Sequence, residues 1–156
     1  MGKLGATRSL AVVLGACLVL TTAAQAAETV TVQVVQIRAT GSGGSKTIDP
    51  ALRGLSRQLS RYPYRSYRRV GWRAFELQPG AQADYPLAEG GFVLQLRPGA
   101  PDAAGFIPLS VTIRDRKRRA ILRTQLRIKN GGTSLVIKEL ASGDGALILA
   151  LTTRSR

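Results

Sequence analysis

Two adjacent stretches of the sequence alternate between apolar and polar residues. In 106–114, FIPLSVTIR, every second residue is a large apolar one, and 120–129, AILRTQLRIK, follows the same pattern with arginine, glutamine and lysine in between. Successive side chains of a β-strand point to opposite faces, so this period of two predicts strands with one buried and one solvated face. The charged run DRKRR at 115–119 separates the two stretches. Together they predict a β-hairpin with a charged tip.

Other stretches are also predicted to be strands because they alternate or are rich in β-branched residues. They are residues 28–39, 64–77 with a bulge at Gly71, 92–96, 133–140 and 146–153. The stretch 146–153, ALILALTT, is apolar on both faces, which predicts a central strand covered on both sides. Asn130, Gly131 and Gly132 predict a hairpin turn in front of 133–140.

One segment, TIDPALRGLSRQLSRY at 47–62, carries helix signals. Asp49 is a suitable N-cap and Pro50 suits the first helical position. A helical wheel gathers the leucines at 52, 55 and 59 on one side and the arginines at 53, 57 and 61 on the other. The predicted fold class is therefore α+β: one N-terminal strand, one amphipathic helix, then an antiparallel β-meander packed on the helix, all in a single domain over residues 27–156.

The first residues have the pattern of a secretory signal. Lys3 and Arg8 precede an apolar run at 10–20, and the small residues Ala24 and Ala26 flank Gln25. We therefore predict a signal peptide at 1–26 and a periplasmic or secreted protein, with no transmembrane span once the signal is removed. Alternatively, Leu14-Gly15-Ala16-Cys17 resembles a lipobox, which would place a lipid on Cys17 and make the protein a lipoprotein.

The composition excludes several kinds of chemistry. Cys17 is the only cysteine and the chain has no histidine, so the predicted mature protein has neither. Disulfides need cysteine, Ser-His and Cys-His nucleophiles need histidine, zinc sites draw on both residues, and haem is usually held by one of them. The nine acidic residues are scattered and form no recognisable motif. We predict no catalytic residue, no metal site and no cofactor; the enzymatic alternative is a hydrolase that depends on carboxylates.

The strongest functional signal is positive charge. The formal net charge is +14, and removing Lys3 and Arg8 with the signal leaves +12. An excess of this size favours an anionic neighbour or a role in solubility. The arginines could also be only the solvated sides of amphipathic elements. The candidate anion-binding residues are Arg53, Arg57, Arg61, Arg65, Arg68, Arg69, Arg73, Arg123 and Arg127.

The segment 61–75, RYPYRSYRRVGWRAF, combines five of these arginines with most of the aromatic residues. Period-two parity places Tyr67, Arg69, Arg73 and Phe75 on one face and leaves Trp72 on the other. Neither face is a clean stacking platform, so the aromatics are expected to pack in the core and nucleic acid is not an expected partner. The expected partner is an anionic envelope component, such as a lipid headgroup, lipopolysaccharide or an acidic polysaccharide, or a protein.

The predicted function is that of an exported, non-enzymatic envelope protein whose arginine-rich face binds an anionic surface or partner. The alternative is an accessory protein of an envelope or secretion assembly that docks through a sheet edge. Ile48-Asp49-Pro50, then Tyr64, Ser66 and Tyr67, and the closing GDGALILAL resemble a group of small exported proteins of Gram-negative bacteria. GGTSLVIKELASGDGALILAL at 131–151 is also similar to a hairpin of secretin outer-membrane pores. Neither resemblance implies a known activity.

Overall fold

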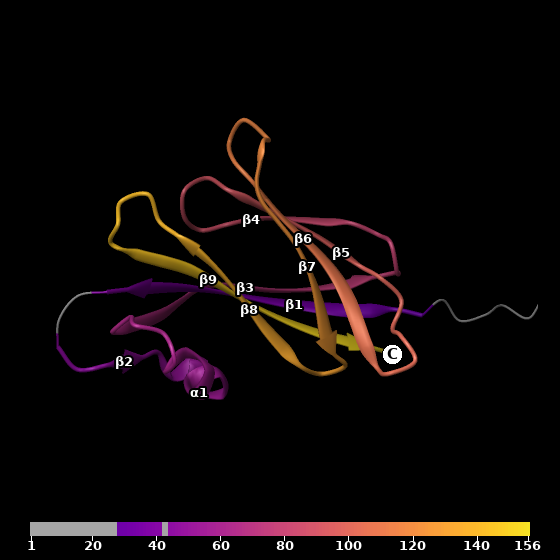
Figure 1. Cartoon of the computed structure of the whole chain (residues 1–156), viewed down its shortest axis with the longest axis horizontal. Coiled ribbons are helices and arrows are strands. Elements are labelled where there is room, and N and C mark those ends of the chain that lie inside the picture. Colours follow the sequence, from indigo (N-terminus) through magenta and orange to yellow (C-terminus); the bar gives the residue numbers. More distant parts are fainter. Residues whose placement is uncertain (1–27, 42–43) are drawn as a thin grey trace, which may run out of the picture.

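The computed structural model describes residues 28–41 and 44–156, so the predicted signal segment and Cys17 lie outside the described residues. Two β-sheets pack against each other, and a short helical segment lies on the far side of one of them (Figure 1). Strands account for 57% of the structure and helices for 8%. Among the described residues, no helix is long and apolar enough to cross a bilayer.

The first sheet has five strands in the order β2-β3-β1-β9-β8. Its strands are β1 (Val30–Thr40), β2 (Thr47–Ile48), β3 (Ser66–Leu77), β8 (Thr133–Glu139) and β9 (Gly145–Ser155). β1 and β9 pair antiparallel along their whole length, from Val30 opposite Ser155 to Thr40 opposite Gly145. The short β2 is the exception, because it runs parallel to β3 and pairs with only two of its residues.

The second sheet has four strands in the order β4-β5-β6-β7, each antiparallel to its neighbour. They are β4 (Ala83–Pro86), β5 (Val93–Pro98), β6 (Phe106–Arg114) and β7 (Ala120–Lys129). β6 and β7 form the predicted hairpin, and their charged tip projects beyond the sheets (Figure 1). β4 lies within residues 78–91, a turn-rich stretch in which no strand was predicted.

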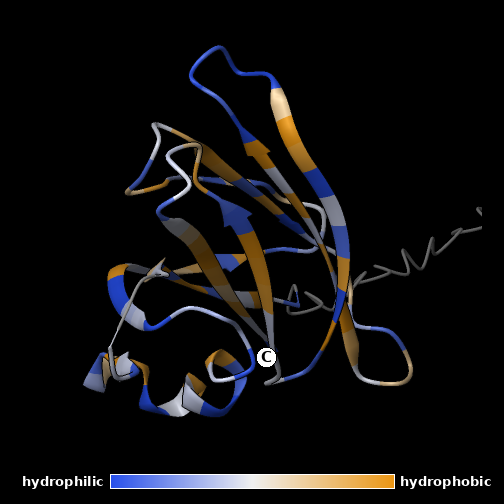
Figure 2. Cartoon of the chain, turned by 60° about the vertical axis from the view of Figure 1, so that its left-hand side comes forward, coloured by the Kyte–Doolittle hydropathy of each residue, from blue (hydrophilic) through white to orange (hydrophobic). Residues whose placement is uncertain are grey.

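The main core lies between the two sheets, because alternate residues of the strands point inward. Figure 2 shows how hydrophobic and hydrophilic residues are distributed along the strands. From the five-stranded sheet come Val30, Val32 and Val34 of β1 and the leucines of β9; from the other sheet come aliphatic residues of β5, β6 and β7. The fully buried members of this cluster include Val32, Val34, Leu94, Leu96, Leu109, Ile113, Leu149 and Leu151.

β9 is covered on both of its faces, as its apolar sequence predicts. Leu147, Leu149 and Leu151 belong to the core between the sheets. Ile148 and Ala150 point the other way and belong to a second cluster with Leu52 and Leu59 of the helical segment. β1 shows the same division: its even residues face the other sheet, and Ile37 lies under the helical segment. The strand prediction for 146–153 is therefore confirmed.

The predicted α+β fold class is wrong, because the helical segment is too short to carry a sheet. It consists of a 3₁₀ helix, η1 (Pro50–Leu55), followed by one α-helical turn, α1 (Ser56–Leu59). The Asp49 cap and the position of Pro50 are as predicted, with the Asp49 carboxylate accepting a bond from the Ala51 N–H at 2.9 Å. Gly54 weakens the segment, and the hydroxyls of Ser56 and Ser60 bond carbonyls of the preceding turn.

The segment covers only one end of the five-stranded sheet, where Leu52 and Leu59 are buried. The β4–β7 meander does not pack on it. That meander packs on the opposite face of the five-stranded sheet, because alternating strands bury most apolar surface against another sheet. The architecture is therefore a two-sheet, mostly antiparallel β-structure.

The predicted hairpin turn at 130–132 also has a different role. β7 and β8 belong to different sheets and do not pair. The turn passes the chain from one sheet to the other, and it is tied to β9: the Gly131 N–H donates to the Thr153 carbonyl at 2.7 Å. The Asn130 side chain both donates to the Ser155 hydroxyl and accepts from its N–H. The next turn, at 140–145, does join a hairpin, that of β8 and β9.

Candidate anion-binding surface

The nine predicted arginines are all exposed, but they do not share one surface. Arg53, Arg57, Arg61 and Arg65 lie on the helical segment and the chain that follows it, at one end of the five-stranded sheet. Three more belong to β3 and two to β7, in the other sheet. The candidate residues of the predicted arginine-rich face are therefore divided between separate parts of the molecule.

The arginines of β3 are split by a bulge. Gln36 is opposite Gly71 and Ile37 is opposite Arg69, so one residue of β3 is left over between them. A bulge of this kind was predicted at Gly71, but it reverses the parity beyond it. Because opposite residues of antiparallel strands share a face, Arg69 lies on the side of the helical segment. Arg73, opposite Val34, lies on the side of the four-stranded sheet.

These β3 arginines have local packing roles. The guanidinium carbon of Arg73 lies 5.2 Å from the ring centre of Phe75 and 5.9 Å from that of Tyr85. β2 pairs only with the start of β3, and the Arg69 N–H donates to the Asp49 carboxylate, so beyond Arg69 one side of β3 is a free sheet edge in the described structure. Positive side chains on an edge strand hinder pairing with other chains. This role accounts for Arg68, near the start of this edge, without a ligand.

A different group of arginines surrounds a single hollow. It lies on the outer face of the four-stranded sheet, the face turned away from the five-stranded sheet, and has a volume of about 290 Å³. Arg97 of β5, Arg114 of β6 and Arg123 of β7 line it, together with one amide and two hydroxyl side chains. We call this site the arginine hollow; its lining residues are Gln95, Arg97, Ser110, Thr112, Arg114 and Arg123.

The register of three strands brings these side chains together. Arg97 is opposite Ser110, and Thr112 is flanked by Gln95 on one side and Arg123 on the other. All of them alternate with inward residues such as Leu96 and Val111, which are buried. The pattern that fills the core therefore also places the arginines on the outer face.

Neutral acceptors hold two of the three guanidinium groups. Arg97 donates to the side-chain oxygen of Gln82 at 3.1 Å. Arg114 donates to the backbone carbonyl of Arg118 at 3.0 Å and to the side-chain oxygen of Gln95 at 3.4 Å. No carboxylate lines the hollow. The groups are thus oriented while their charge is not neutralised, and each guanidinium, with five N–H donors, keeps some of them free.

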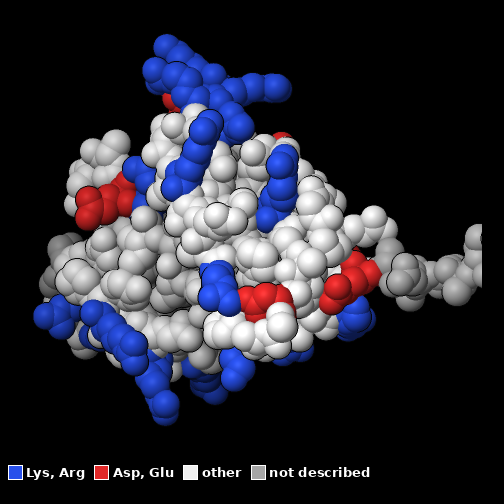
Figure 3. Space-filling model, turned by 45° about the vertical axis from the view of Figure 1, so that its right-hand side comes forward, with Lys and Arg blue, Asp and Glu red and all other residues white. Residues whose placement is uncertain are grey.

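The charged hairpin tip adjoins this hollow. A second hollow of about 380 Å³ shares Gln95 and Arg114 with it and extends to Arg118. Asp84 and Asp115 line this second hollow. Asp115 is bonded to the backbone N–H and the guanidinium of Arg119, both within the tip. Figure 3 shows the densest group of Lys and Arg side chains at the top of the view, where the β6–β7 hairpin projects.

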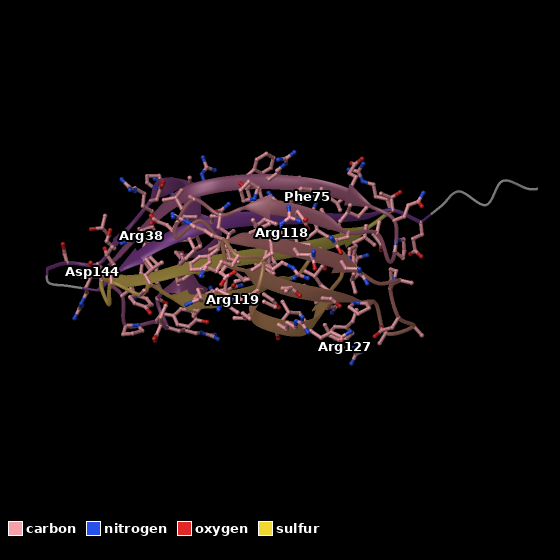
Figure 4. The ribbon with its side chains drawn as sticks, turned by 90° about the horizontal axis from the view of Figure 1, so that it is seen from above. Arg38, Phe75, Arg118, Arg119, Arg127 and Asp144 are labelled. Carbon is pink, nitrogen blue, oxygen red and sulfur yellow. The ribbon has the colours of Figure 1, made fainter. Side chains whose placement is uncertain are left out.

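Arg127 does not belong to the arginine hollow, although it was predicted as a site residue. It forms an ion pair with Asp102 and lies with its guanidinium carbon 4.9 Å from the ring centre of Phe106. The bond from Arg127, with further bonds from the N–H groups of Phe106 and Ala104, lowers the pKa of the Asp102 carboxyl. Figure 4 shows Arg127 and the hairpin-tip residue Arg118 well apart.

Several carboxylates have structural roles in turns and caps. Asp49 accepts bonds from the N–H groups of Ala51 and Arg69, and these bonds lower the pKa of its carboxyl. Asp102 does the same in the loop before β6. Glu89 forms an ion pair with Arg38 at 2.8 Å, toward one end of the molecule (Figure 4). Over residues 28–41 and 44–156, no group of three or more Asp, Glu, His or Cys side chains could hold a metal ion.

Three aromatic residues of 61–75, namely Tyr64, Tyr67 and Phe75, pack at the hydrophobic clusters as predicted. Tyr67 is buried and its hydroxyl donates to the Leu59 carbonyl at 2.8 Å, while Tyr64 and Phe75 make edge-on ring contacts. Trp72 was expected in the core, but 53% of it is exposed. The bulge in front of it turns the indole to the outer side of the five-stranded sheet, opposite Val35.

Sequence reasoning missed Arg97 and Arg114 as members of a site. Their place on solvated faces follows from the alternation of 92–98 and 106–114, but their proximity to Arg123 depends on the pairing of β5, β6 and β7.

Comparison of the chain with protein families, with curated proteins and with solved structures gives no match.

Proposed function

We propose that this is an exported, non-enzymatic envelope protein, periplasmic or secreted, that binds an anionic surface or partner through the outer face of the four-stranded sheet. The observation that carries the proposal is the arginine hollow. Arg97, Arg114 and Arg123 surround it, no carboxylate lines it, and the bonds that orient the first two come from neutral acceptors.

Arginine suits this role because its planar guanidinium donates parallel hydrogen bonds to phosphate or carboxylate oxygens. Ser110 and Thr112 add hydroxyl donors beside the guanidinium groups. The net charge of +12 for residues 27–156, from 21 basic and nine acidic residues, also favours anionic partners over long range. The hairpin tip adds positive charge next to the hollow.

The second candidate function is docking through a sheet edge. β7 spans ten residues and lies at the edge of its sheet, with one paired neighbour in the described structure. Such an edge offers unpaired N–H and C=O groups to an added strand. Binding of this kind changes little with ionic strength, whereas binding through arginines weakens steeply.

The test measures binding to vesicles of phosphatidylglycerol mixed with phosphatidylcholine, with pure phosphatidylcholine vesicles as the neutral reference. The variant replaces Arg97, Arg114 and Arg123 with glutamine. At about 1 kcal/mol for each basic residue at an anionic surface, this variant should bind roughly 100-fold more weakly. Rising salt should weaken binding of the unchanged protein.

The matched control replaces Arg53, Arg57 and Arg61 with glutamine, which removes the same charge from the other side of the molecule. It should lose much less affinity than the first variant. Equal losses would mean that only net charge matters and would refute the assignment to the hollow. Binding to a protein partner that is insensitive to salt would favour the sheet edge instead.

A further inference from the structure

Trp72 lies in a trough on the outer face of the five-stranded sheet, remote in the fold from the arginine hollow. It is the only tryptophan of the chain and one of two large hydrophobic residues that are exposed in the described structure. Tryptophan is usually well buried. The bulge in β1–β3 pairing aims this one outward, and bulges often serve to redirect a side chain at a functional site.

The trough consists of two adjoining hollows. The first, of about 260 Å³, lies between Trp72 and the helical segment. The second, of about 160 Å³, continues toward the end of β9, and both include Gln33 and Thr152. Each is smaller than the 300–1,000 Å³ of a pocket that encloses a whole ligand, so the trough suits an extended ligand that lies along it.

Gly54 forms part of the wall facing Trp72. A Cβ added at this glycine would have no atom within 4 Å, so there is open space for a larger side chain at this lining position. The floor is made of strand residues of β1 and β9. The trough therefore has an indole on one side and a glycine on the other.

The lining combines four kinds of contact. The indole offers a broad apolar face with negative potential. Gln33 supplies an amide, and Thr31 and Thr152 supply hydroxyls. Arg69 lines the first hollow, and Arg154 and Arg156 line the second. Glu76 is on the same face of the sheet, opposite Thr31. Three arginines and one nearby carboxylate give the surface around the two hollows a net positive charge.

We propose that this trough binds a polysaccharide that carries carboxylate groups. The C–H faces of a pyranose ring are apolar and slightly positive, so they stack on an indole. The hydroxyls of the sugar pair with amide and hydroxyl side chains, and the acidic groups pair with the arginines. This inference uses a different face from the arginine hollow and does not depend on it.

The test uses polygalacturonate as the acidic probe and dextran as the neutral one, with the fluorescence of Trp72 as the readout. Polygalacturonate should shift the emission and protect it from acrylamide quenching. Trp72→Ala, followed by sedimentation or calorimetry, should weaken binding about tenfold or more, by analogy with the loss of an aromatic stacking partner. Gly54→Leu should fill the trough and weaken binding similarly, with an unchanged melting temperature.

The position of the site and its requirement for acidic groups are tested by separate outcomes. If Gly54→Leu and Trp72→Ala both bind polygalacturonate like the unchanged protein, there is no site in the trough. Equal binding of dextran would refute the requirement for acidic groups. The variant lacking Arg97, Arg114 and Arg123 should keep its polygalacturonate binding in the trough; loss of binding in that variant alone would move the site to the arginine hollow.

Discussion

The helical segment is predicted to stabilise the fold through Leu59, and this can be tested by replacing Leu59 with aspartate. Leu59 is completely buried in the cluster with Leu52, Tyr67 and Ile148. A charged carboxylate there would find no partner and could reach water only if the segment left the sheet. Arg57→Asp is the matched control, because Arg57 is exposed two residues earlier in the same turn.

The size of the effect follows from the buried area. Leu52 and Leu59 are at most 1% exposed, and full burial of each leucine is worth roughly 1.5–3 kcal/mol. If the segment leaves the sheet, the burial energy of its two leucines is lost, which is about 3–6 kcal/mol. The exposure of Ile37 and Ile148 in the sheet beneath it adds to this loss. Domains of this size are stable by only about 5–15 kcal/mol. Leu59→Asp should thus remove a large share of the stability.

The assay is urea denaturation combined with hydrogen exchange. Leu59→Asp should lower the free energy of unfolding by at least about 3 kcal/mol. Backbone amides of η1 and α1 should exchange rapidly, while amides of β6, whose core lies on the other side, should stay protected longest. Arg57→Asp should change the free energy of unfolding by no more than about 0.5 kcal/mol. Equal effects of the two replacements would refute the docking argument.

Three further predictions concern other regions. Gly145→Ala should destabilise the protein by at least about 2 kcal/mol in thermal denaturation. The reason is that the φ of Gly145 is 144° and an added Cβ would lie 2.0 Å from a carbonyl oxygen of β1. The control, Gly54→Ala, is at an open position without positive φ and should be neutral or slightly stabilising. Asp102 has a folded pKa below its ordinary value, so its contribution is complete above about pH 4 and is lost as the pH falls through the folded pKa. Asp102→Asn should therefore be less stable than the unchanged protein at pH 7, and the two should converge in acid. The exported protein should begin at Ala27 or Glu28 by intact mass, and a diacylglycerol-modified cysteine at its start would contradict the signal-peptide prediction.

The strands were predictable because each carries its own pattern. The alternation of Ile107 to Ile113 and the two apolar faces of β9 determine which faces are buried, whatever the partner. The length of the helical segment, and with it the fold class, was not predictable in the same way. Asp49 and Pro50 correctly mark the start of a helix, but they carry no information about its length. The sequence after Gly54 forms only one α-helical turn.

The candidate site depended on information that local patterns do not contain. Parity along β3 was right up to the bulge and reversed after it, so Trp72 shares a face with Tyr67 and not with Arg68. Trp72 was expected in the core together with the other aromatic residues of the segment, and it is exposed instead. The arginine hollow depends on the register between β5, β6 and β7, which joins Arg97 to Arg123 across 26 positions of the chain. Counting charges along the sequence favoured the arginine-rich segment 53–73, whose members the fold separates.

The pairing of β1 with β9 has a consequence for how the chain folds. Every partner of β1 in this ladder lies at residues 145–155, and the nearest pair in sequence is Thr40 with Gly145. Such contacts must close a long loop before they contribute stability, so folding is expected to be slow for a chain of this length. Until residues 145–155 are synthesised, β1 has an open edge, and the inward-facing leucines of β5 and β6 lack the part of the core that β9 supplies. A nascent or truncated chain that stops before Gly145 should therefore be prone to aggregation.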